Sequence, residues 1–414
     1  MTRRAPVYRW TVDPQTQARA PLRVGELTQQ DTRWEFLYDP EYLALGPAAW
    51  ELDPTGIRNK QRSAFTRVGS APFPVFCDVA LSGWSLDALR KRAAAFLGAG
   101  TAGDEPWGWW ERLLYAPADG FGALFVGHLK DKPDAFGALK DALGRVTKAS
   151  LAAAARDSSS GAMGGERPKL ALYADSGAGA APKPVLLKFA QPSERADTVV
   201  AEATALSLAA ELGMRVPAHE VAWFNDAPAL SIDRFDRAAG PLGPVFHCVS
   251  AATALDLLPG SDVDDAKRSY VKLRSKLKRP ADAAELYARI VLNAVVGNND
   301  DHPWNTSLRQ VGLGDWELSP LYDVLPYFER QGLPVFRMDV TRQRPSRAAN
   351  RANLLAAGRQ IAGLDEAQAW AVVERTKAHV RDHWRRLFVQ HGAAHGAVRA
   401  EDWAKVFEHP WLPD

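Results

Sequence analysis

The pattern of apolar residues changes near residue 245, and this change limits the folds that are open to the chain. Between residues 169 and 236 the sequence predicts strand, strand, helix, strand and strand, whereas from about 245 onward it is mostly helical. At 414 residues the chain is long for a single hydrophobic core, so two or three compact units are expected. The fold class that follows is α+β, with a strand-rich lobe ahead of a helical one.

The overall composition is that of an ordered globular protein without a strong charge bias. Apolar residues make up 46% and charged residues 24% of the chain, which argues against extensive disorder. The formal net charge of +2 gives no strong indication about partners. The two cysteines, Cys77 and Cys248, lie far apart in the sequence, so neither a disulfide framework nor a thiolate metal site is expected.

The sequence gives no sign of export or of a membrane anchor. The first stretch, MTRRAPVYRWTVDPQTQ, has paired arginines but no apolar segment behind them, so it does not resemble a secretory signal. No apolar run approaches the roughly 20 residues that span a bilayer. We therefore expect a cytoplasmic protein with no membrane partner.

The composition predicts three domains. Residues 1–150 form a mixed α/β subdomain that ends in an Ala/Leu-rich helical stretch, and the Ser/Gly-rich segment after it indicates a boundary. Residues 151–240 form a strand-rich lobe, in which Asp197 is a candidate helix N-cap. Residues 241–414 form the helical lobe. The strands predicted for the middle lobe are 169–175, 183–190, 219–224 and 227–237.

The stretch GNNDDHPWN, directly after the apolar run YARIVLNAVV, concentrates polar groups where a buried helix ends. Asp300 and Asn305 have a D-x4-N spacing, and Asp323 follows after two short strands. Phosphoryl transfer by kinases uses one carboxylate to orient the attacking hydroxyl and an Asn and a second carboxylate to hold Mg²⁺. The spacing alone is a weak pattern, and helix caps and turns are the alternative explanation.

Two upstream residues agree with the kinase interpretation. Lys188 lies in the apolar strand PVLLKFA, where a role on ATP phosphates would explain a buried ammonium. Glu202, early in the next helix, is placed to form the ion pair that positions such a lysine. Alternatively, Lys188 extends to water from an edge strand, and Glu202 is an exposed acid favoured by the helix dipole.

Three further features are ambiguous. The segment SSSGAMGGERPK can cradle phosphates through its backbone N–H groups, but it matches no standard phosphate-loop motif, so by itself it is interpreted as a linker. His302 lacks the neighbouring His or Cys residues that a metal site needs, and it belongs to the polar loop. The basic run 267–280 is interpreted as a solvated helix face, with a nucleic-acid patch as the alternative.

Taken in order, these motifs resemble the HipA-type serine/threonine kinases, the toxins of HipBA toxin–antitoxin pairs. GNNDDHPWNTSLRQ and WELSPLYDVLP are similar to the family's catalytic and metal-binding segments. MGGERPKLAL, LLKFA, LSIDRFDR and CVSAATAL resemble its successive motifs, and WEFLYDPEYLAL and VALSGWSLDALRKR its N-terminal subdomain. The resemblance covers nearly the whole chain and implies a bilobal protein-kinase-like fold with an extra N-terminal α/β subdomain and a helical C-lobe.

The resemblance also implies roles for individual residues. It assigns catalysis to the loop, phosphate binding to a lysine and a glycine pair, adenine contacts to the hinge, and inhibitory autophosphorylation to a Ser-rich loop. The catalytic residues are Asp300, Asn305 and His302; the metal ligands are Asn305 and Asp323; the nucleotide-binding residues are Lys188, Glu202, Asp233, Phe235, Asp236, Gly164 and Gly165; the phosphorylation candidates are Ser158, Ser159 and Ser160.

The chain departs from the family pattern at several places. NNDDHPWN stands where the family often has NTDDH or TDGHAKN, SA replaces an acidic pair in CVSAAT, and LSGWS replaces PDGWG. Two extra residues, GA, separate the three serines from MGGERPK. None of these changes removes a core catalytic group, so a competent kinase is expected.

The resemblance implies an ATP- and Mg²⁺-dependent protein Ser/Thr kinase. Family analogy indicates a translation component, such as an aminoacyl-tRNA synthetase, as the protein substrate. It also indicates a HipB-like antitoxin as partner, with operator DNA contacted only through that antitoxin. Two alternatives remain open: a small-molecule phosphotransferase with the same catalytic set, and a largely non-catalytic co-repressor that binds the antitoxin.

Overall fold

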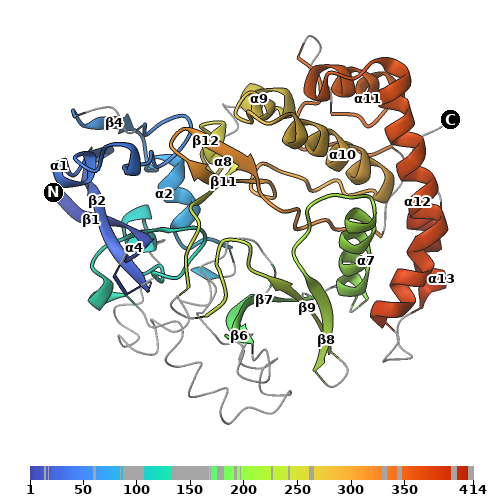
Figure 1. The fold of residues 1–414 in the computed structure, drawn as a ribbon, viewed down its shortest axis with the longest axis horizontal. Helices are drawn as coiled ribbons and strands as arrows, with labels where there is room; N and C mark the ends of the chain where they lie inside the picture. Colours follow the sequence, from blue (N-terminus) through green and yellow to red (C-terminus); the bar gives the residue numbers. More distant parts are fainter. Residues whose placement is uncertain are drawn as a thin grey trace. The chain divides into compact units, whose positions relative to one another are not determined.

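The structure is a computed structural model, in which the chain forms two compact units (Figure 1). The first unit consists of residues 1–189, 233–249 and 312–314, and the second of residues 190–232, 250–311 and 315–414. The described residues are 1–13, 15–16, 18–58, 62–83, 85–86, 107–132, 167, 169–174, 181–190, 194–195, 197–224, 227–240, 243–260, 265–328, 333–342, 347–392 and 399–408.

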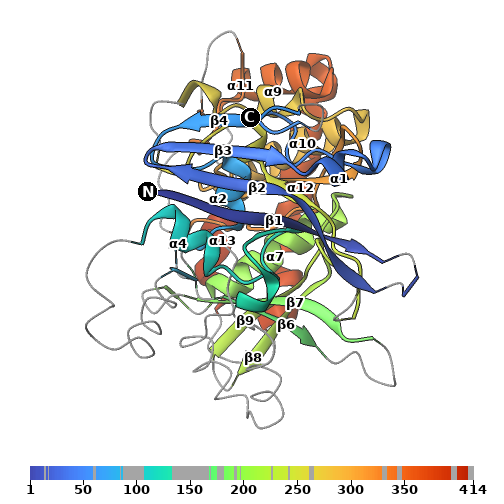
Figure 2. The same ribbon diagram turned by 90° about the vertical axis from the view of Figure 1, so that its left-hand side faces the viewer.

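The first unit is built on a five-stranded antiparallel sheet with the strand order β4-β3-β2-β1-β5, and Figure 2 shows β1 to β4 side by side. A bulge between Val7 and Tyr8 shifts the register of the long β1–β2 pair. The strands are β1 Thr2–Val12, β2 Arg19–Gln30, β3 Arg33–Tyr38, β4 Phe65–Val68 and β5 Leu124–Val126.

The sheet buries one face because its side chains alternate. In β3, Trp34, Phe36 and Tyr38 are buried while their neighbours are exposed or half-buried, which is the two-residue period of a strand. Phe76 packs on Phe36 with ring centroids 5.6 Å apart. The short helices of this unit are α1 Pro40–Leu43, η1 Gly46–Ala48, α2 Pro74–Val79, α4 Trp109–Leu114 and η2 Leu129–Asp131.

The strands predicted for the middle lobe are confirmed. β6 Lys169–Ala174 pairs with β7 Lys183–Phe189, and β8 His219–Phe224 pairs with β9 Ala227–Asp233, both antiparallel. The predicted helix is α7 Thr198–Glu211. Asp197 occupies its N-cap position, but the expected capping bond is absent, because the Asp197 carboxylate instead accepts two bonds from Arg195 at 2.7 and 3.0 Å.

The second unit is mainly helical, as predicted. α12 runs along α7 and α10, and Trp384 of α12 stacks on Phe407 of α13 with centroids 5.1 Å apart (Figure 1). Its other elements are α8 Ala251–Ala254, η3 Asp265–Lys267, α9 Tyr270–Arg274, α10 Pro280–Val296, β11 Ser307–Gly312, β12 Asp315–Leu318, α11 Arg351–Ala357, the π-helical turn η4 Gly358–Ala362, α12 Glu366–Gly392 and α13 Ala400–Phe407. The short strand β10 Cys248–Ser250 precedes α8.

The basic run 267–280 forms a shorter helix than its pattern predicts. Only Tyr270–Arg274 is α-helical, and the apolar residues Tyr270, Leu273 and Leu277 of the run are all buried. Its cations bond within the chain: Arg274 Nε donates to the Ile361 carbonyl at 3.0 Å, and Arg279 pairs with Asp315 at 2.9 Å. The run is therefore a packed connection that leads into α10.

The domain boundaries predicted near residues 150 and 240 stay a prediction. Residues 133–166 lie outside the described ranges, and both compact units are discontinuous in the sequence. None of the helices in the described ranges combines the length and the apolar content that a bilayer-spanning segment needs.

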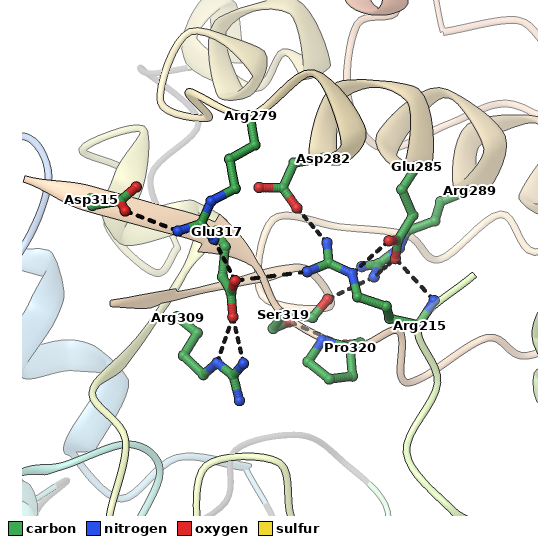
Figure 3. A network of polar contacts seen from close by, with 10 residues as sticks. All are labelled: Arg215, Arg279, Asp282, Glu285, Arg289, Arg309, Asp315, Glu317, Ser319 and Pro320. Atoms are coloured by element: carbon green, nitrogen blue, oxygen red, sulfur yellow. Dashed lines mark hydrogen bonds and ion pairs between the residues drawn. The ribbon is translucent and has the colours of Figure 1, made fainter. Parts of the chain in front are cut away.

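A network of charges ties α10 to the β11–β12 pair (Figure 3). Arg215, just after α7, donates to Glu285 at 2.6 Å and also pairs with Asp282 near the start of α10. Glu317 of β12 accepts from Arg279 and Arg309, each at 2.5 Å. Because several charges share partners, the network holds these elements in one arrangement better than isolated surface pairs would.

Like Asp282, Arg289 is a buried member of this network. Its side chain is 4% exposed, pairs with Glu285 one turn earlier on α10, and donates to the Ser319 carbonyl at 2.6 Å. The Leu321 amide in turn donates to the Arg215 carbonyl at 2.7 Å. The segment that leads to Asp323 is therefore held by the Arg289 side chain of α10 and by the Arg215 carbonyl after α7.

Replacing Glu285 is expected to destabilise the protein strongly. Glu285→Ala leaves the buried Arg289 guanidinium without its carboxylate, which costs about 3 kcal/mol of unfolding free energy. Chemical denaturation would measure this change. Glu401→Ala, whose side chain is 77% exposed, is the matched control and should change stability by less than about 0.5 kcal/mol. Equal effects of the two substitutions would contradict the role assigned to Glu285.

The stability of the first unit is expected to depend on pH through His247. Its buried ring donates from Nε2 to the Leu52 carbonyl at 2.6 Å, and burial, aided by Arg9, lowers its pKa from 6.5 to about 3. Below pH 6.5 the unfolded chain therefore binds more protons than the folded one. The free energy of unfolding drops as the pH is lowered, by about 2 kcal/mol between pH 6.5 and pH 5. Thermal unfolding at these two pH values should show a smaller loss in His247→Gln, and an unchanged loss would overturn the assignment.

Candidate active site

The polar loop begins where α10 ends. Its apolar face runs to Val296, and Gly297 stops the helix in the left-handed conformation, with φ at 73°. Two backbone bonds shape the next residues: the His302 amide donates to the Asp300 carbonyl, and the Asn305 amide donates to the His302 carbonyl, each at 2.8 Å. The Asn305 side chain also donates from Nδ2 to the Asp300 carbonyl at 2.9 Å. Asp300 and Asn305 are thus held next to each other.

A buried carboxylate, Asp301, anchors this loop from inside. It accepts hydrogen bonds from the Tyr270 hydroxyl and from Asn293 Nδ2, the latter at 2.6 Å. Asn298 Nδ2 donates to Asn293 Oδ1 at 3.1 Å, and its own Oδ1 accepts from the Asp300 amide at 3.2 Å. Burial raises the pKa of Asp301, although its hydrogen-bond partners oppose the shift.

Asp300, the next residue in the chain, faces the other way. Its side chain is 57% exposed, and Arg337 Nε lies 3.5 Å from its Oδ1. An exposed pair of this kind contributes little to stability. Of the two adjacent carboxylates, Asp300 is therefore the one that a dissolved substrate can reach.

Asp323 has an unusual backbone conformation and follows Tyr322, whose side chain contacts the same loop. Its φ of 59° is in the left-handed region, which few residues other than glycine adopt. The preceding Tyr322 donates from its hydroxyl to the Trp304 carbonyl at 3.0 Å and shares a hydrogen bond with Ser307. Backbone strain of this kind is found at functional sites, where the surrounding structure holds it in place.

The start of α8 supports the loop from a third direction. The Ala251 amide donates to the Thr306 carbonyl at 2.7 Å, and the Ala252 amide donates to the Pro303 carbonyl at 3.1 Å. Ser250 caps this helix by accepting from the Thr253 amide at 3.1 Å. The small residues of CVSAAT therefore use their backbone, rather than an acidic side chain, to position the loop.

His302 belongs to the loop and is half-buried. Its ring lies edge-on to Trp304, with centroids 5.9 Å apart, and among the described residues its buried Nδ1 has no hydrogen-bond partner. In the described part of the chain, the His302 ring forms no hydrogen bond with the side chain of Asp300 or of Asn305. Its catalytic role stays a prediction.

The predicted phosphate-binding pair belongs to two different compact units. Lys188 is buried on β7, directly opposite the equally buried Lys169 on β6. Glu202 is 1% exposed on α7 of the second unit. Burial excludes both alternatives weighed above, an edge-strand lysine reaching water and an exposed helix-start acid. The ion pair between them stays a prediction.

The predicted hinge residues lie in a segment fixed by buried charges. The Asp236 carboxylate contacts Arg234 at 2.9 Å, pairs with Arg237, and accepts from the Gly122 amide at 2.9 Å. Burial alone would raise the pKa of Asp236, but the two guanidinium groups outweigh it and hold that pKa below its usual value. Its side chain therefore holds two chain segments together.

The remaining hinge residues have separate surroundings. The Asp233 carboxylate pairs with Lys183 at 2.7 Å, which leaves its backbone groups as the ones a nucleotide base would use. Adenine contacts by Asp233 and Phe235 stay predictions. Ser158, Ser159, Ser160, Gly164 and Gly165 lie outside the described residues.

Sequence reasoning missed the residues that hold the loop from inside, namely Asp301, Asn293 and Tyr270. A usable signal existed for one of them, because Asn293 interrupts the apolar run YARIVLNAVV at a buried position. A polar residue there needs a partner. Nothing in the sequence pointed to Tyr270, which is more than 20 residues from the loop and reaches it only through the fold.

The loop after α10 and the left-handed Asp323 lie in the mainly helical unit of an α+β protein. The HipA-like C-terminal domain family matches residues 161–384, more than half of the chain. The chain therefore belongs to the HipA-like family, and the resemblance noted from its motifs is confirmed.

Similar proteins agree with this assignment. Over 151 residues the chain is 31% identical to the "Putative kinase Y4mE" of Sinorhizobium fredii strain NGR234, a match that covers 34% of each chain. The chain thus spans about a third of the length of this curated relative. The HipA toxin–antitoxin structure from Shewanella oneidensis, described as a complex of HipA, HipB and operator DNA, matches with a TM-score of 0.64 at 18% identity. That match covers 96% of this chain and 94% of the other.

A further solved structure, the Helicobacter pylori proinflammatory kinase CtkA, matches 59% of this chain and 92% of its own at 10% identity, with a TM-score of 0.36. The Shewanella match shows that the fold is HipA-like, as the motifs predicted. The family model and the Shewanella structure agree on a HipA-like protein, and the Sinorhizobium relative is named a putative kinase.

The two adjacent aspartates of the loop are expected to differ sharply in their effect on stability. Asp301→Ala removes the buried acceptor of Tyr270 and Asn293 and should cost about 3 kcal/mol of unfolding free energy. Asp300→Ala, at an exposed position, should change it by less than about 0.5 kcal/mol. Urea denaturation of the two variants checks this, and the reverse order would show that the inward and outward carboxylates are exchanged.

Proposed function

We propose that this protein is an ATP- and Mg²⁺-dependent serine/threonine protein kinase of the HipA type. The observation that carries the proposal is the loop after α10, in which an exposed Asp300 is held against Asn305 while the neighbouring Asp301 is locked inside. A loop built only as a turn would not need three buried polar residues to fix its orientation.

Asp300 is proposed to accept a hydrogen bond from the substrate hydroxyl, orient its oxygen towards the γ-phosphate and take up its proton. Its exposed position suits a macromolecular substrate. In the part of the chain that the structure describes, its carboxylate pairs with Arg337 alone. The rigid part is the backbone beneath it, which Asn298 and Asn305 hold by hydrogen bonds.

Asn305 and Asp323 fit the ligand set of Mg²⁺, since both offer hard oxygen donors. The Asn305 amide nitrogen is already used on the Asp300 carbonyl, which leaves its Oδ1 as the ligand atom. When bound, the ion would neutralise negative charge on the phosphates. Lys188, supported by Glu202, is proposed to hold the phosphates, and the backbone at Asp233 and Phe235 the adenine, with Gly164 and Gly165 in the phosphate loop.

The finer points of the proposal come from the family. Ser158, Ser159 and Ser160 are the candidates for autophosphorylation, and a HipB-like antitoxin is the proposed partner. A translation component is the proposed protein substrate, with the cytoplasm as the place of action. The Shewanella HipA structure, solved with HipB and operator DNA, supports an antitoxin partner of this kind.

The first experiment measures phosphate transfer from labelled ATP with Mg²⁺ to the protein itself and to proteins of a cell lysate. Asp300→Ala should lower the transfer rate by at least about 100-fold, because it removes the group that orients and deprotonates the hydroxyl. Asp323→Ala should lower transfer and raise the Mg²⁺ concentration that half-maximal transfer requires, because it removes one proposed metal ligand. Asp382→Ala, an exposed position on α12, is the matched control and should transfer phosphate like the unaltered protein.

The outcomes separate the candidate functions. Labelled protein that requires Asp300 supports the protein kinase. ATP turnover that requires Asp300 but labels no protein supports a small-molecule phosphotransferase instead. If the unaltered protein binds ATP and transfers nothing, and repression of its own operator survives Asp300→Ala, a co-repressor role replaces the kinase.

A further inference from the structure

The packed faces of α7 and α12 bring together three potential metal ligands that phosphoryl transfer does not use. Figure 1 shows the two helices side by side in the second unit. Glu211 is the last residue of α7, while His379 and His383 lie four residues apart on α12 and so share one face of that helix. The two imidazole rings are stacked, with centroids 4.2 Å apart.

The ligand atoms of these side chains are close enough to hold one ion. One nitrogen or oxygen from each residue lies within 4.8 Å of the others. Tetrahedral Zn²⁺ binds ligands at about 2.0–2.1 Å, which places them about 3.3 Å apart, so small side-chain rotations complete the site. Two histidines at a four-residue helical spacing and a carboxylate from another element are a known ligand set for this ion.

The hydrogen bonds around the cluster leave the right atoms for a cation. His383 Nδ1 lies 3.0 Å from the His379 carbonyl and donates to it, so Nε2 keeps the lone pair that binds a metal. Arg386 donates to Glu211 Oε1 at 2.5 Å, which leaves Oε2 facing the histidines. Partners of this kind orient metal ligands in known sites.

His379 faces the Glu211 carboxylate where the two helices pack. Its buried Nε2 lies 3.1 Å from Glu211 Oε2, an ion pair when the ring is protonated. When the ring is neutral with its proton on Nδ1, two lone pairs face each other there, which is costly. A cation between this nitrogen and the carboxylate would satisfy both groups.

We propose that Glu211, His379 and His383 form a binding site for a divalent transition-metal ion of the Zn²⁺ class. The ion links the end of α7 to the middle of α12 and takes water as its fourth ligand. Its role is structural: it fixes α7, the helix that also carries Glu202. This site is separate from Asp300, Asn305 and Asp323, and the proposal holds whether or not the protein transfers phosphate.

The test uses the full chain without a histidine tag, stripped of metal by a chelator. Calorimetric titration with ZnCl2 should show one ion per chain, and Co²⁺ should give the visible absorption of a tetrahedral site. His379→Gln and His383→Gln should each weaken binding at least about tenfold. Zn²⁺ should raise the unfolding temperature of the unaltered protein and not that of either variant.

Three further variants complete the test. His128→Gln, in the first unit, should bind Zn²⁺ like the unaltered protein. His391→Gln tests the other histidine pair of α12 and β8, in which His219 and His391 both contact Ser207 at 2.9 Å. Loss of binding in His391→Gln but not in His379→Gln overturns the proposal, as does an unaltered protein that binds no metal. Glu211→Gln, which keeps both histidines, should bind more weakly than His128→Gln if the carboxylate is a ligand.

Discussion

The orientation of the candidate active site depends on one buried carboxylate. Asp301 accepts from Tyr270 and Asn293, and these two bonds decide which of two adjacent aspartates faces inward. With Asp301 held inside, the neighbouring Asp300 side chain lies at the surface and is 57% exposed. An unpaired carboxylate would be expensive to bury, so the inward position is stable only with both donors present.

The charged network beneath the loop extends this control to Asp323. Arg215, Glu285 and Arg289 connect the first turns of α10 with the segment after β12 (Figure 3). The loop leaves the other end of the same helix. One rigid helix therefore sets the positions of both the loop and the strained aspartate, although they are separated by two strands in the sequence.

The candidate site was predictable from the sequence only in part. Asp300, Asn305 and Asp323 were predicted from the spacing that kinases use for phosphoryl transfer. The structure holds Asn305 against Asp300, while the convergence of Asp323 on them stays a prediction. The capping role of Asp197 was wrong, because local sequence could not show that Arg195 competes for its carboxylate. The cluster of Glu211 on α7 with His379 and His383 on α12 could not be predicted from the sequence, because Glu211 and His379 are more than 160 residues apart.

By itself, the sequence determined the element types, the α+β class and the order of the motifs, because strand and helix periods and helix-stop residues act over short distances. Only the tertiary structure decided which polar groups are buried and with what partners. Lys188 and Glu202 are both buried, Asp236 sits between two arginines, and Asp301 rather than Asp300 faces inward. The physical reason is that burial is a property of packing between distant segments, whereas a sequence window records only neighbours along the chain.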